Sequence, residues 1–303
     1  MTALLPLDRT PLGITRREID DLFLPFARID EAEWERRFAK RSGWIWRQYL
    51  RRRLGFSDRR LQEAVADEYG TEWSRIDYRS YSLDRPPEHR SPWHWGGRRY
   101  LASNRGGTRV RQLFLVRALE LMKPRRVLEV GCGNGINLLL LAGRFPEVAF
   151  TGIDLTTEGV AAAQALQQQP SLPEHLRSFA PLPLHDAAAF KRITFQSGDA
   201  SALPFGDKSF DLVITVLSLE QMERLRAKVF PEIARLASAH SFMIEPFRDV
   251  NAGGITRRYV VARDYLQARI ADLARSGLHP LWATADMPQE AFLKAAAVLC
   301  RVG

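Results

Sequence analysis

The stretch VLEVGCGNGINLLLLA, residues 127–142, decides the fold of this 303-residue chain. It begins with a short apolar run, interrupted only by Glu129, which is typical of a buried parallel strand. Glycines follow at alternate positions from Gly131 to Gly135, and a second apolar run predicts a helix directly after them. Glycine tolerates positive φ at a tight turn and lets backbone approach a ligand closely. The helix N-terminus then presents unpaired N–H groups to an anionic group.

Three more segments follow in an order that extends this pattern. TGIDL places Asp154 at the end of a second predicted strand, where a carboxylate can accept ribose hydroxyls. GDASALPF places Asp199 after a third strand, and SFDLVITVLSLEQM predicts a fourth strand with its loop. The alternation of strands and helices predicts a doubly wound α/β sheet.

The sequence E-V-G-C-G-N-G, from Glu129 to Gly135, resembles the first motif of class I S-adenosylmethionine-dependent methyltransferases, in particular their small-molecule "type 11" group. Its spacing differs from the dinucleotide fingerprint G-x-G-x-x-G. The resemblance implies a seven-stranded Rossmann-like sheet in the strand order 3-2-1-4-5-7-6, with strand 7 antiparallel. It also implies S-adenosylmethionine as the cofactor and S-adenosylhomocysteine as the product, with no metal.

The resemblance assigns roles to residues of these segments. Glu129 and the glycine turn would hold the methionine end, Asp154 the ribose, and Asp199 with Ala200 the adenine. Cys132 lies inside the turn, where we interpret it as a small packing residue rather than a nucleophile. The predicted cofactor-binding set is Glu129, Gly131, Cys132, Gly133, Gly135, Asp154, Leu155, Asp199, Ala200 and Leu217.

The loop after strand four is expected to face both the sulfonium and the methyl acceptor. Many small-molecule members have L-x-H here, but Gln221 takes the place of that histidine and cannot act as a base at neutral pH. Methyl transfer depends mainly on orientation, and a base is needed only when the acceptor must lose a proton. The weak candidates for a base are Glu220, Glu245 and His94, each with the alternative role of an ordinary hydrogen-bonding residue.

Composition limits the class of protein. The hydrophobic content of 46% and charged content of 26% are typical of a soluble globular chain. No apolar run approaches the ~20 residues of a transmembrane helix, and we recognise no secretory signal. The two cysteines do not indicate a disulfide framework, so we expect a cytoplasmic protein. The oligomeric state does not follow from the sequence.

The charge is distributed unevenly. Residues 1–125 hold 26 Lys/Arg against 17 Asp/Glu and six of the seven tryptophans, so they account for the whole net charge of +9. We therefore predict a helical and loop extension over 1–107, which caps the acceptor side, and a methyltransferase domain over 108–303 with an irregular insertion at 169–190.

Four short helices are predicted in the extension, over 16–24, 31–41, 44–56 and 57–69, the first with a Thr15/Glu18 capping box. Ten Lys/Arg and a single acid lie between residues 36 and 60. Such a face attracts a polyanion, nucleic acid or an acidic membrane surface. The alternative is a solvated face whose long side chains cover apolar surface.

Residues 80–107 contain prolines and glycines that exclude regular structure over most of the segment. Its aromatic residues are too many for a disordered linker. We predict an ordered loop near the site, with a packed connector as the alternative. The predicted substrate-binding residues are Trp93, His94, Trp95, Arg98, Arg99, Tyr100 and, from the loop after strand four, Gln221.

The remaining elements are predicted from periodicity. They are a helix over 108–122, strands over 126–131, 149–155, 192–197, 210–216 and 241–246, helices over 135–144, 157–168, 224–238 and 258–275, and two last strands in a tail whose QEAFLKAAA equally reads as helix.

The predicted function is in-line methyl transfer to an O, N or C atom of a small metabolite, and the aromatic and basic side chains suit an anionic or aromatic one. The first alternative is a methyltransferase acting on RNA or protein, recruited by the basic helices. The second is a nucleotide-cofactor-binding protein that is not a methyltransferase.

Overall fold

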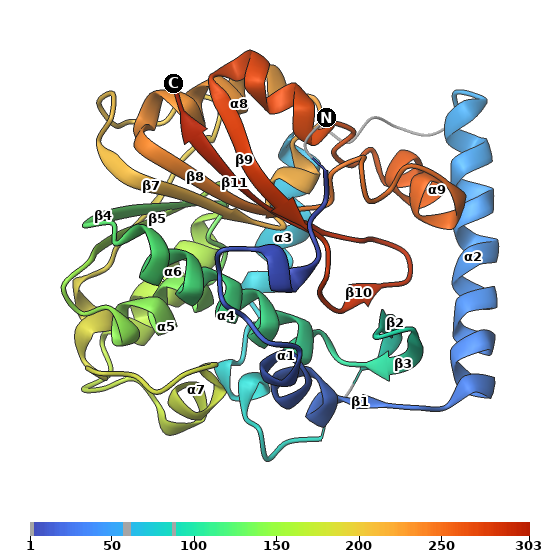
Figure 1. The fold of residues 1–303 in the computed structure, drawn as a ribbon, viewed down its shortest axis with the longest axis horizontal. Helices are drawn as coiled ribbons and strands as arrows, with labels where there is room; N and C mark the ends of the chain where they lie inside the picture. Colours follow the sequence, from blue (N-terminus) through green and yellow to red (C-terminus); the bar gives the residue numbers. More distant parts are fainter. Residues whose placement is uncertain (1–2, 57–61, 87–88) are drawn as a thin grey trace.

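The computed structural model describes residues 3–56, 62–86 and 89–303. At its centre is a seven-stranded sheet in the order β6-β5-β4-β7-β8-β11-β9 (Figure 1). β11 is antiparallel to β8 and β9, and the other neighbours are parallel. This is the predicted 3-2-1-4-5-7-6 arrangement, so the fold class is confirmed. The strands are β4 (Arg126–Val130), β5 (Ala149–Asp154), β6 (Thr194–Ser197), β7 (Phe210–Val216), β8 (Ala237–Glu245), β9 (Leu278–Thr284) and β11 (Ala296–Val302).

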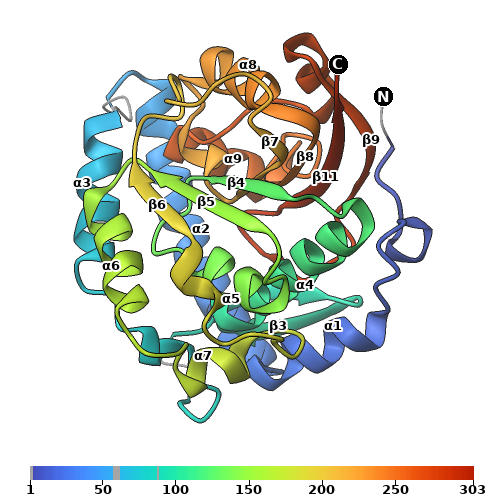
Figure 2. The ribbon, with the colours of Figure 1, turned by 90° about the vertical axis from the view of Figure 1, so that its left-hand side faces the viewer.

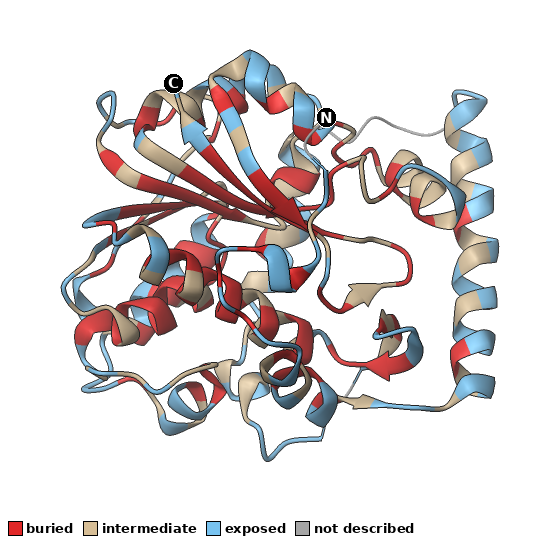
Figure 3. Cartoon of the chain, viewed as in Figure 1, coloured by how far each residue is buried: buried red, intermediate tan, exposed pale blue. Residues whose placement is uncertain are grey.

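Helices cover both faces of this sheet, so its central strands are apolar on both sides. Val127 packs into one core with α4 (Asn104–Met122) and α5 (Ile136–Arg144). Its neighbour Leu128 packs into a second core with α8 (Arg226–Leu236). Figure 3 shows the buried residues concentrated along the central strands and along α4 and α5. This burial explains why the strands appear in the sequence as continuous apolar runs.

The insertion at 169–190 is more regular than predicted. It contains α7 (Glu174–Phe179) and leads into the 3-10 turn η4 (Ala189–Arg192). Leu176 and Phe179, three residues apart, are buried in the same core as Val127. The insertion is therefore a packed part of the helical layer.

The N-terminal extension begins with α1 (Arg16–Phe23), which has the predicted Thr15/Glu18 capping box. The predicted break after residue 41 is wrong, because α2 (Glu31–Arg53) is a single helix. Gly43 within it costs only about 1 kcal/mol relative to alanine. Leu7, Leu12 and Phe23 belong to the same core as Val127, so the extension packs directly on the sheet's helical layer.

The fourth predicted helix begins at Ser57, which lies outside the described residues. The structure has α3 (Gln62–Trp73), and the predicted stop at Gly70 is wrong. A Cβ at Gly70 would lie 3.1 Å from Glu158 Oε2 of α6 (Thr157–Gln167). Glycine at this position therefore allows α3 to pack closely against α6, beside the β6 edge of the sheet (Figure 2).

The prediction of an irregular loop over 80–107 is wrong for residues 91–102 and 104–107, because α4 begins at Asn104 rather than at the predicted residue 108. Residues 91–102 form a hairpin of β2 (Ser91–Trp95) and β3 (Arg98–Ala102). Gly96 and Gly97 form its turn with φ of 57° and 75°, and paired positive φ values are what a two-residue hairpin turn requires. A short strand from each end of the chain, β1 (Ala27–Arg28) and β10 (Gln289–Glu290), completes a small sheet in the order β1-β3-β2-β10.

The predicted helix over 258–275 is correct only over 258–263, which belong to a helix that begins earlier. Asp264 takes a left-handed conformation with φ of 58°, which ends α9 (Gly254–Arg263), and a separate 3-10 turn η6 (Ile270–Ser276) follows. The ambiguous QEAFLKAAA forms β10, a connecting loop and the start of β11 rather than a helix.

Candidate active site

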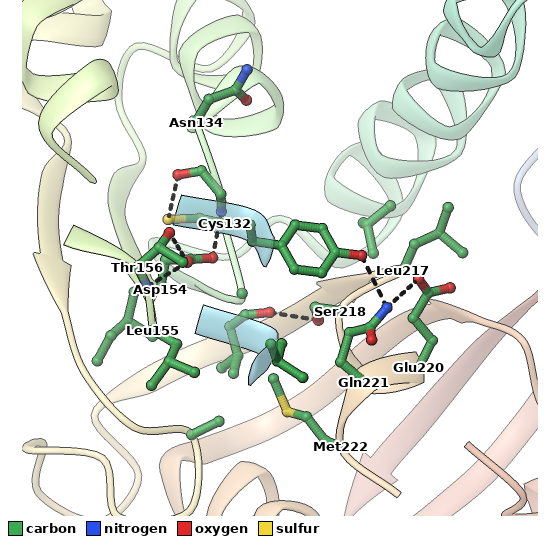
Figure 4. A pocket seen from close by; sticks show the side chains of 18 of the residues that line it. Cys132, Asn134, Asp154, Leu155, Thr156, Leu217, Ser218, Glu220, Gln221 and Met222 are labelled. Atoms are coloured by element: carbon green, nitrogen blue, oxygen red, sulfur yellow. Dashed lines mark hydrogen bonds between the residues drawn. The ribbon is translucent and has the colours of Figure 1, made fainter. Parts of the chain in front are cut away.

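A cavity of about 610 Å³ lies at the carboxyl ends of β4, β5 and β7. One wall is the glycine turn after β4 together with the loops after β5, β6 and β7 (Figure 4). The opposite wall comes from the N-terminal extension, through α3 and Tyr81, and from α4. Ligands of open α/β sheets bind at this edge, where the strand order reverses.

The glycine turn requires glycine at each of its three positions. Gly131, Gly133 and Gly135 have φ of 75°, 52° and 73°. A Cβ at Gly131 would lie 2.3 Å from Ser218 Cβ, and one at Gly133 would lie 2.8 Å from Trp73 Cζ2. Both the conformation and the close neighbours thus exclude a side chain. The bare backbone of Gly131 and Gly133 faces the cavity, whereas Gly135 does not line it and lies against Phe195.

Asp154 holds this turn in place as well as lining the cavity. Its Oδ2 accepts a hydrogen bond of 2.7 Å from the Gly133 N–H. Its Oδ1 accepts from the N–H and the hydroxyl of Thr156, at 2.9 and 2.7 Å. Three of about four acceptor positions of this carboxylate are therefore used by the protein, and the remaining one lies on Oδ2. Leu155 lines the cavity beside it.

Glu129 and Cys132 are both buried at the turn. Glu129 lies behind Asn137, whose side-chain amide donates to Glu129 Oε1 at 2.7 Å and itself lines the cavity. Glu129 Oε2 has no hydrogen-bond partner among the described residues. Burial raises the pKa of Glu129 to about 8, so its carboxyl is mostly protonated at neutral pH. Burial also raises the pKa of the Cys132 thiol well above its usual value, which supports a packing role.

The loop after β6 brings Asp199 and Ala200 to the cavity, and α3 contacts it. Burial alone would raise the pKa of Asp199, but hydrogen bonds from the Ser201 N–H and the Gln62 side chain outweigh it and lower the pKa. Gln62 belongs to α3. The N-terminal extension therefore holds the carboxylate that the sequence predicts at the adenine end.

The loop after β7 links the two walls of the cavity. Gln221 Nε2 donates to Tyr69 Oη of α3 at 2.9 Å and to Glu220 Oε1 at 2.7 Å (Figure 4). Leu217 lines the cavity with a left-handed φ of 51°. The Ser218 N–H and hydroxyl are held by Glu245 Oε1 and the Val130 carbonyl, at 3.1 and 2.8 Å. This loop is thus fixed both to the sheet and to the extension.

Only one of the three weak candidates for a base lines the cavity, namely Glu220. Burial and the nearby Glu245 raise the pKa of Glu220 to about 8. Glu245 is buried behind the loop, which it positions, and burial raises its pKa to about 7. His94 lies on the hairpin, where burial lowers its pKa, and it stacks on Trp34 at 5.2 Å.

The other predicted substrate-binding residues of the hairpin do not line this cavity either. Trp93 is buried against Phe23, and the Trp95 indole N–H donates to Asp20 Oδ1 at 2.6 Å. Arg99 pairs with Glu35 at 2.8 Å. The hairpin residues whose described contacts join it to α1 and α2 are Trp93, His94, Trp95, Arg99 and Tyr100, and Arg98 is exposed.

The predictions from the sequence did not include the cavity wall that α3 forms. Val65, Tyr69 and Trp73 of α3 line the cavity, and their spacing of four places them on one helix face. The same spacing is present in the sequence, but the predicted helix end at Gly70 leaves Trp73 outside the helix. Arg111 of α4 also lines the cavity; its guanidinium donates to Thr108 Oγ1 at 3.0 Å, and burial lowers its pKa. Arg111 makes no ion pair within the described parts of the chain.

Comparison with known proteins agrees with this geometry. Residues 128–244 match the family model described as "Methyltransferase domain". The chain contains a class I S-adenosylmethionine-dependent methyltransferase domain. This match begins in β4 and ends in β8, so it spans the glycine turn and all the loops that form the cofactor-side wall.

Two curated relatives are similar over part of the chain. The chain is 29% identical over 122 residues to ajmaline N-methyltransferase of Rauvolfia serpentina, covering 40% of this chain and 35% of the relative. It is 33% identical over 115 residues to fatty-acid O-methyltransferase of Mycolicibacterium smegmatis, covering 38% and 34%. The chain thus covers about a third of the length of these relatives.

A solved structure extends the likeness in fold. The crystal structure of the [4+2]-cyclase SpnF superposes with a TM-score of 0.51 at 20% identity, covering 79% of this chain and 97% of that chain. Because that protein is named as a cyclase, its likeness supports the fold alone.

The cavity fits S-adenosylmethionine, the cofactor of this methyltransferase class. The turn offers a side-chain-free backbone, and Glu129 Oε2 is buried without a partner among the described residues. Those residues contain no group of three or more His, Cys, Asp or Glu that could hold a metal ion, and the expected absence of a metal stays a prediction. No helix in the described parts is long and apolar enough to cross a membrane.

Proposed function

We propose that this protein uses S-adenosylmethionine to methylate an O, N or C atom of a small organic acceptor. The observation that carries the proposal is one cavity of about 610 Å³ with the glycine turn on one side and α3 on the other. This volume is within the range of about 300–1,000 Å³ that is typical of small-molecule sites. A single chamber of this kind suits a cofactor and a compact acceptor held together.

When bound, the cofactor supplies an activated methyl group. The residues of the cofactor-side wall would hold it in the roles predicted from the sequence: the turn for the methionine end, Asp154 for ribose, and Asp199 with Ala200 for adenine. Glu129 does not line the cavity and would act on the methionine end through Asn137, which does. Asp154 has one acceptor position left, so it would take one ribose hydroxyl unless the Gly133 N–H is released. We also propose that the protein acts in the cytoplasm, as the sequence predicts.

The acceptor would bind against Tyr69, Trp73 and Tyr81, all of which line the cavity. These rings offer an apolar stacking surface with polar hydroxyls. Arg111 on the same side favours an acceptor with a carboxylate or another anionic group, because a buried guanidinium gains most from a charged partner. In this proposal residues 1–107 cover the acceptor side of the site as the sequence predicts, but they do so through α3 rather than through the hairpin.

Glu220 is the residue we propose to accept a proton from the acceptor. Its pKa of about 8 is close to the neutral range, which suits a general base. Gln221, fixed between Tyr69 and Glu220, would hold the carboxylate toward the cavity. The acceptor atom would then lose its proton to Glu220 as it gains the methyl group.

The test is release of S-adenosylhomocysteine with a panel of small acceptors. Since the relatives are named for ajmaline and for fatty acids, the panel should contain alkaloid amines, fatty acids and aromatic carboxylates. We expect turnover with at least one class and its loss in Glu220→Gln. Turnover with total RNA or a protein substrate, and with none of the small acceptors, would contradict the proposal.

A second candidate function is methylation of RNA or protein, supported by a groove of about 930 Å³ at the surface of α2. Six basic residues line it against two acids, and such a surface favours a polyanion. Asn104 lines both this groove and the main cavity. The basic residues of the groove are Arg36, Arg37, Lys40, Arg41, Arg47 and Arg90.

A further inference from the structure

The C-terminal half of α2 presents large apolar side chains to solvent. Trp46, Leu50 and Leu54 are 42%, 50% and 68% exposed, and Phe56, just past the helix, is 70% exposed. The first three follow each other at intervals of four, so they lie along one face of the helix. Four exposed large hydrophobic residues thus lie within eleven positions, and such a cluster marks an interaction site more often than isolated exposed residues do. We call these four residues the α2 patch.

The end of α2 fixes Phe56 beside the helix. Gly55 takes the left-handed conformation with φ of 79°, the Phe56 N–H donates to the Arg51 carbonyl at 2.8 Å, and the Gly55 N–H donates to the Arg52 carbonyl at 3.2 Å. These two bonds are the helix-ending pattern that places the residue after the glycine back against the last turn. The patch is therefore a structured surface up to its last residue.

The opposite side of α2 is anchored to the rest of the protein. Ile45 is fully buried, and Arg52 pairs with the buried Asp264 at 2.6 Å. On the patch itself, Arg258 of α9 lies 4.0 Å above the ring of Trp46, so this ring forms the border between the patch and α9. Figure 1 shows the C-terminal end of α2 extending past α9 at the edge of the molecule, and Figure 3 shows it as largely exposed. The helix is thus held firmly while its patch faces outward.

Positive charge surrounds the patch. Arg47, Arg51 and Arg53 are interleaved with its apolar residues, and no acidic residue occurs between positions 44 and 56. The basic groove, which Arg47 also lines, continues from here toward the N-terminal end of the same helix. Apolar residues flanked by arginines are the composition of helices that lie in the interface of an anionic bilayer.

We propose that the α2 patch docks the protein onto an anionic lipid surface, with Leu50, Leu54 and Phe56 entering the headgroup boundary and Arg51 and Arg53 contacting lipid phosphates. A second copy of the chain fits this surface poorly, because the same arginines would face each other across a two-fold axis. A nucleic acid would engage the arginines but leave the apolar residues in water.

The α2 end also leads, through residues 57–61, to α3, which forms the acceptor wall of the main cavity. A protein docked at this end would bring that wall toward the lipid surface. The proposal does not depend on methyl transfer, and its test needs neither cofactor nor acceptor.

The test is co-sedimentation of the full chain with vesicles of phosphatidylcholine alone and of phosphatidylcholine mixed with phosphatidylglycerol. We expect binding to the mixed vesicles and little to the neutral ones. Leu50→Ser/Leu54→Ser and Arg51→Glu/Arg53→Glu should each reduce the vesicle partition coefficient by on the order of tenfold or more. The matched controls are Leu121→Ser and Leu281→Ser, which are 43% and 51% exposed on other elements and should bind as the wild type does.

The four variants change only exposed side chains, so we expect them to unfold at nearly the same temperature as the wild type. This measurement shows that they are folded. Absence of binding to the mixed vesicles overturns the proposal, as does equal loss in the patch variants and the controls. Light scattering that shows a dimer dissolved by Leu50→Ser/Leu54→Ser would also overturn it, and would assign the patch to a second copy.

Discussion

Trp73 of α3 lies directly against Gly133 of the glycine turn, so close that a Cβ at Gly133 would be 2.8 Å from Trp73 Cζ2. The two residues come from opposite walls of the cavity, one from the N-terminal extension and one from the methyltransferase domain. Gly133 also needs its φ of 52°. A side chain there would therefore disturb the acceptor wall as well as the turn.

This contact separates two kinds of variant. Gly133→Val should abolish S-adenosylhomocysteine binding, because the branched side chain has no unstrained conformation and no space. Trp73→Ala should leave cofactor affinity little changed but raise the acceptor KM by on the order of tenfold, as loss of a large apolar contact implies. Calorimetry and steady-state kinetics measure the two effects, and Trp73→Phe should restore most of the acceptor affinity. A Trp73→Ala protein that loses the cofactor and keeps its acceptor KM would reverse our assignment of the walls.

Asp154→Ala should weaken S-adenosylhomocysteine binding by on the order of 1–3 kcal/mol, the cost of leaving polar partners unpaired. In the structure these partners are Gly133 and Thr156, and in our proposal the ribose of the ligand is a further one. Asp21→Ala, at an exposed carboxylate of α1, is the control and should bind as the wild type does. Unchanged affinity in a folded Asp154→Ala protein would refute the ribose assignment.

The rate of methyl transfer should rise with pH through about 8, since Glu220 acts only when deprotonated and its pKa is raised to about 8. Glu220→Gln should lower kcat by about 100-fold or more, as loss of a general base does, and should remove this rise. The pH profile of kcat distinguishes the role, because a structural effect alone would scale the profile without changing its shape. A Glu220→Gln enzyme with the wild-type profile would eliminate Glu220 as the base.

Stability should depend on pH through Glu129. Its pKa is raised from 4.5 to about 8 on folding, so the folded state binds the proton more tightly than the unfolded state. The stabilisation is complete below about pH 4.5 and is lost as the pH rises through about 8. Glu129→Gln should therefore raise Tm relative to the wild type more at pH 8 than at pH 5. An equal Tm difference at both pH values would mean that this carboxyl is not protonated in the folded protein.

Arg98→Ala and Arg99→Ala test the acceptor-binding role predicted for the β2–β3 hairpin, whose residues do not line the cavity in the structure. Arg99 pairs with Glu35 where both side chains are about half exposed or more, and such pairs contribute about 0–1 kcal/mol. We expect small changes in Tm and an unchanged acceptor KM. A large increase in acceptor KM in either variant would return the hairpin to the acceptor site.

The sheet and the cofactor side were predictable because their signals are local. The glycine turn, the acids at strand ends and the buried apolar runs each determine their own element. The acceptor wall was not, because Gly70 has the local signal of a helix end and its role depends on Glu158 in a distant helix. The hairpin was missed although its Gly96–Gly97 turn is a local signal; the prolines and histidines around it suggested a loop.

The proposal that one cavity holds both the cofactor and the acceptor depends first on the cofactor binding there. The most direct measurement is isothermal titration calorimetry of the full chain with S-adenosylhomocysteine and, separately, with NAD. We predict one S-adenosylhomocysteine bound per chain, with affinity reduced in Asp154→Ala and unchanged in Asp21→Ala, and no heat from NAD. Binding of NAD without S-adenosylhomocysteine, or of neither, would contradict the account.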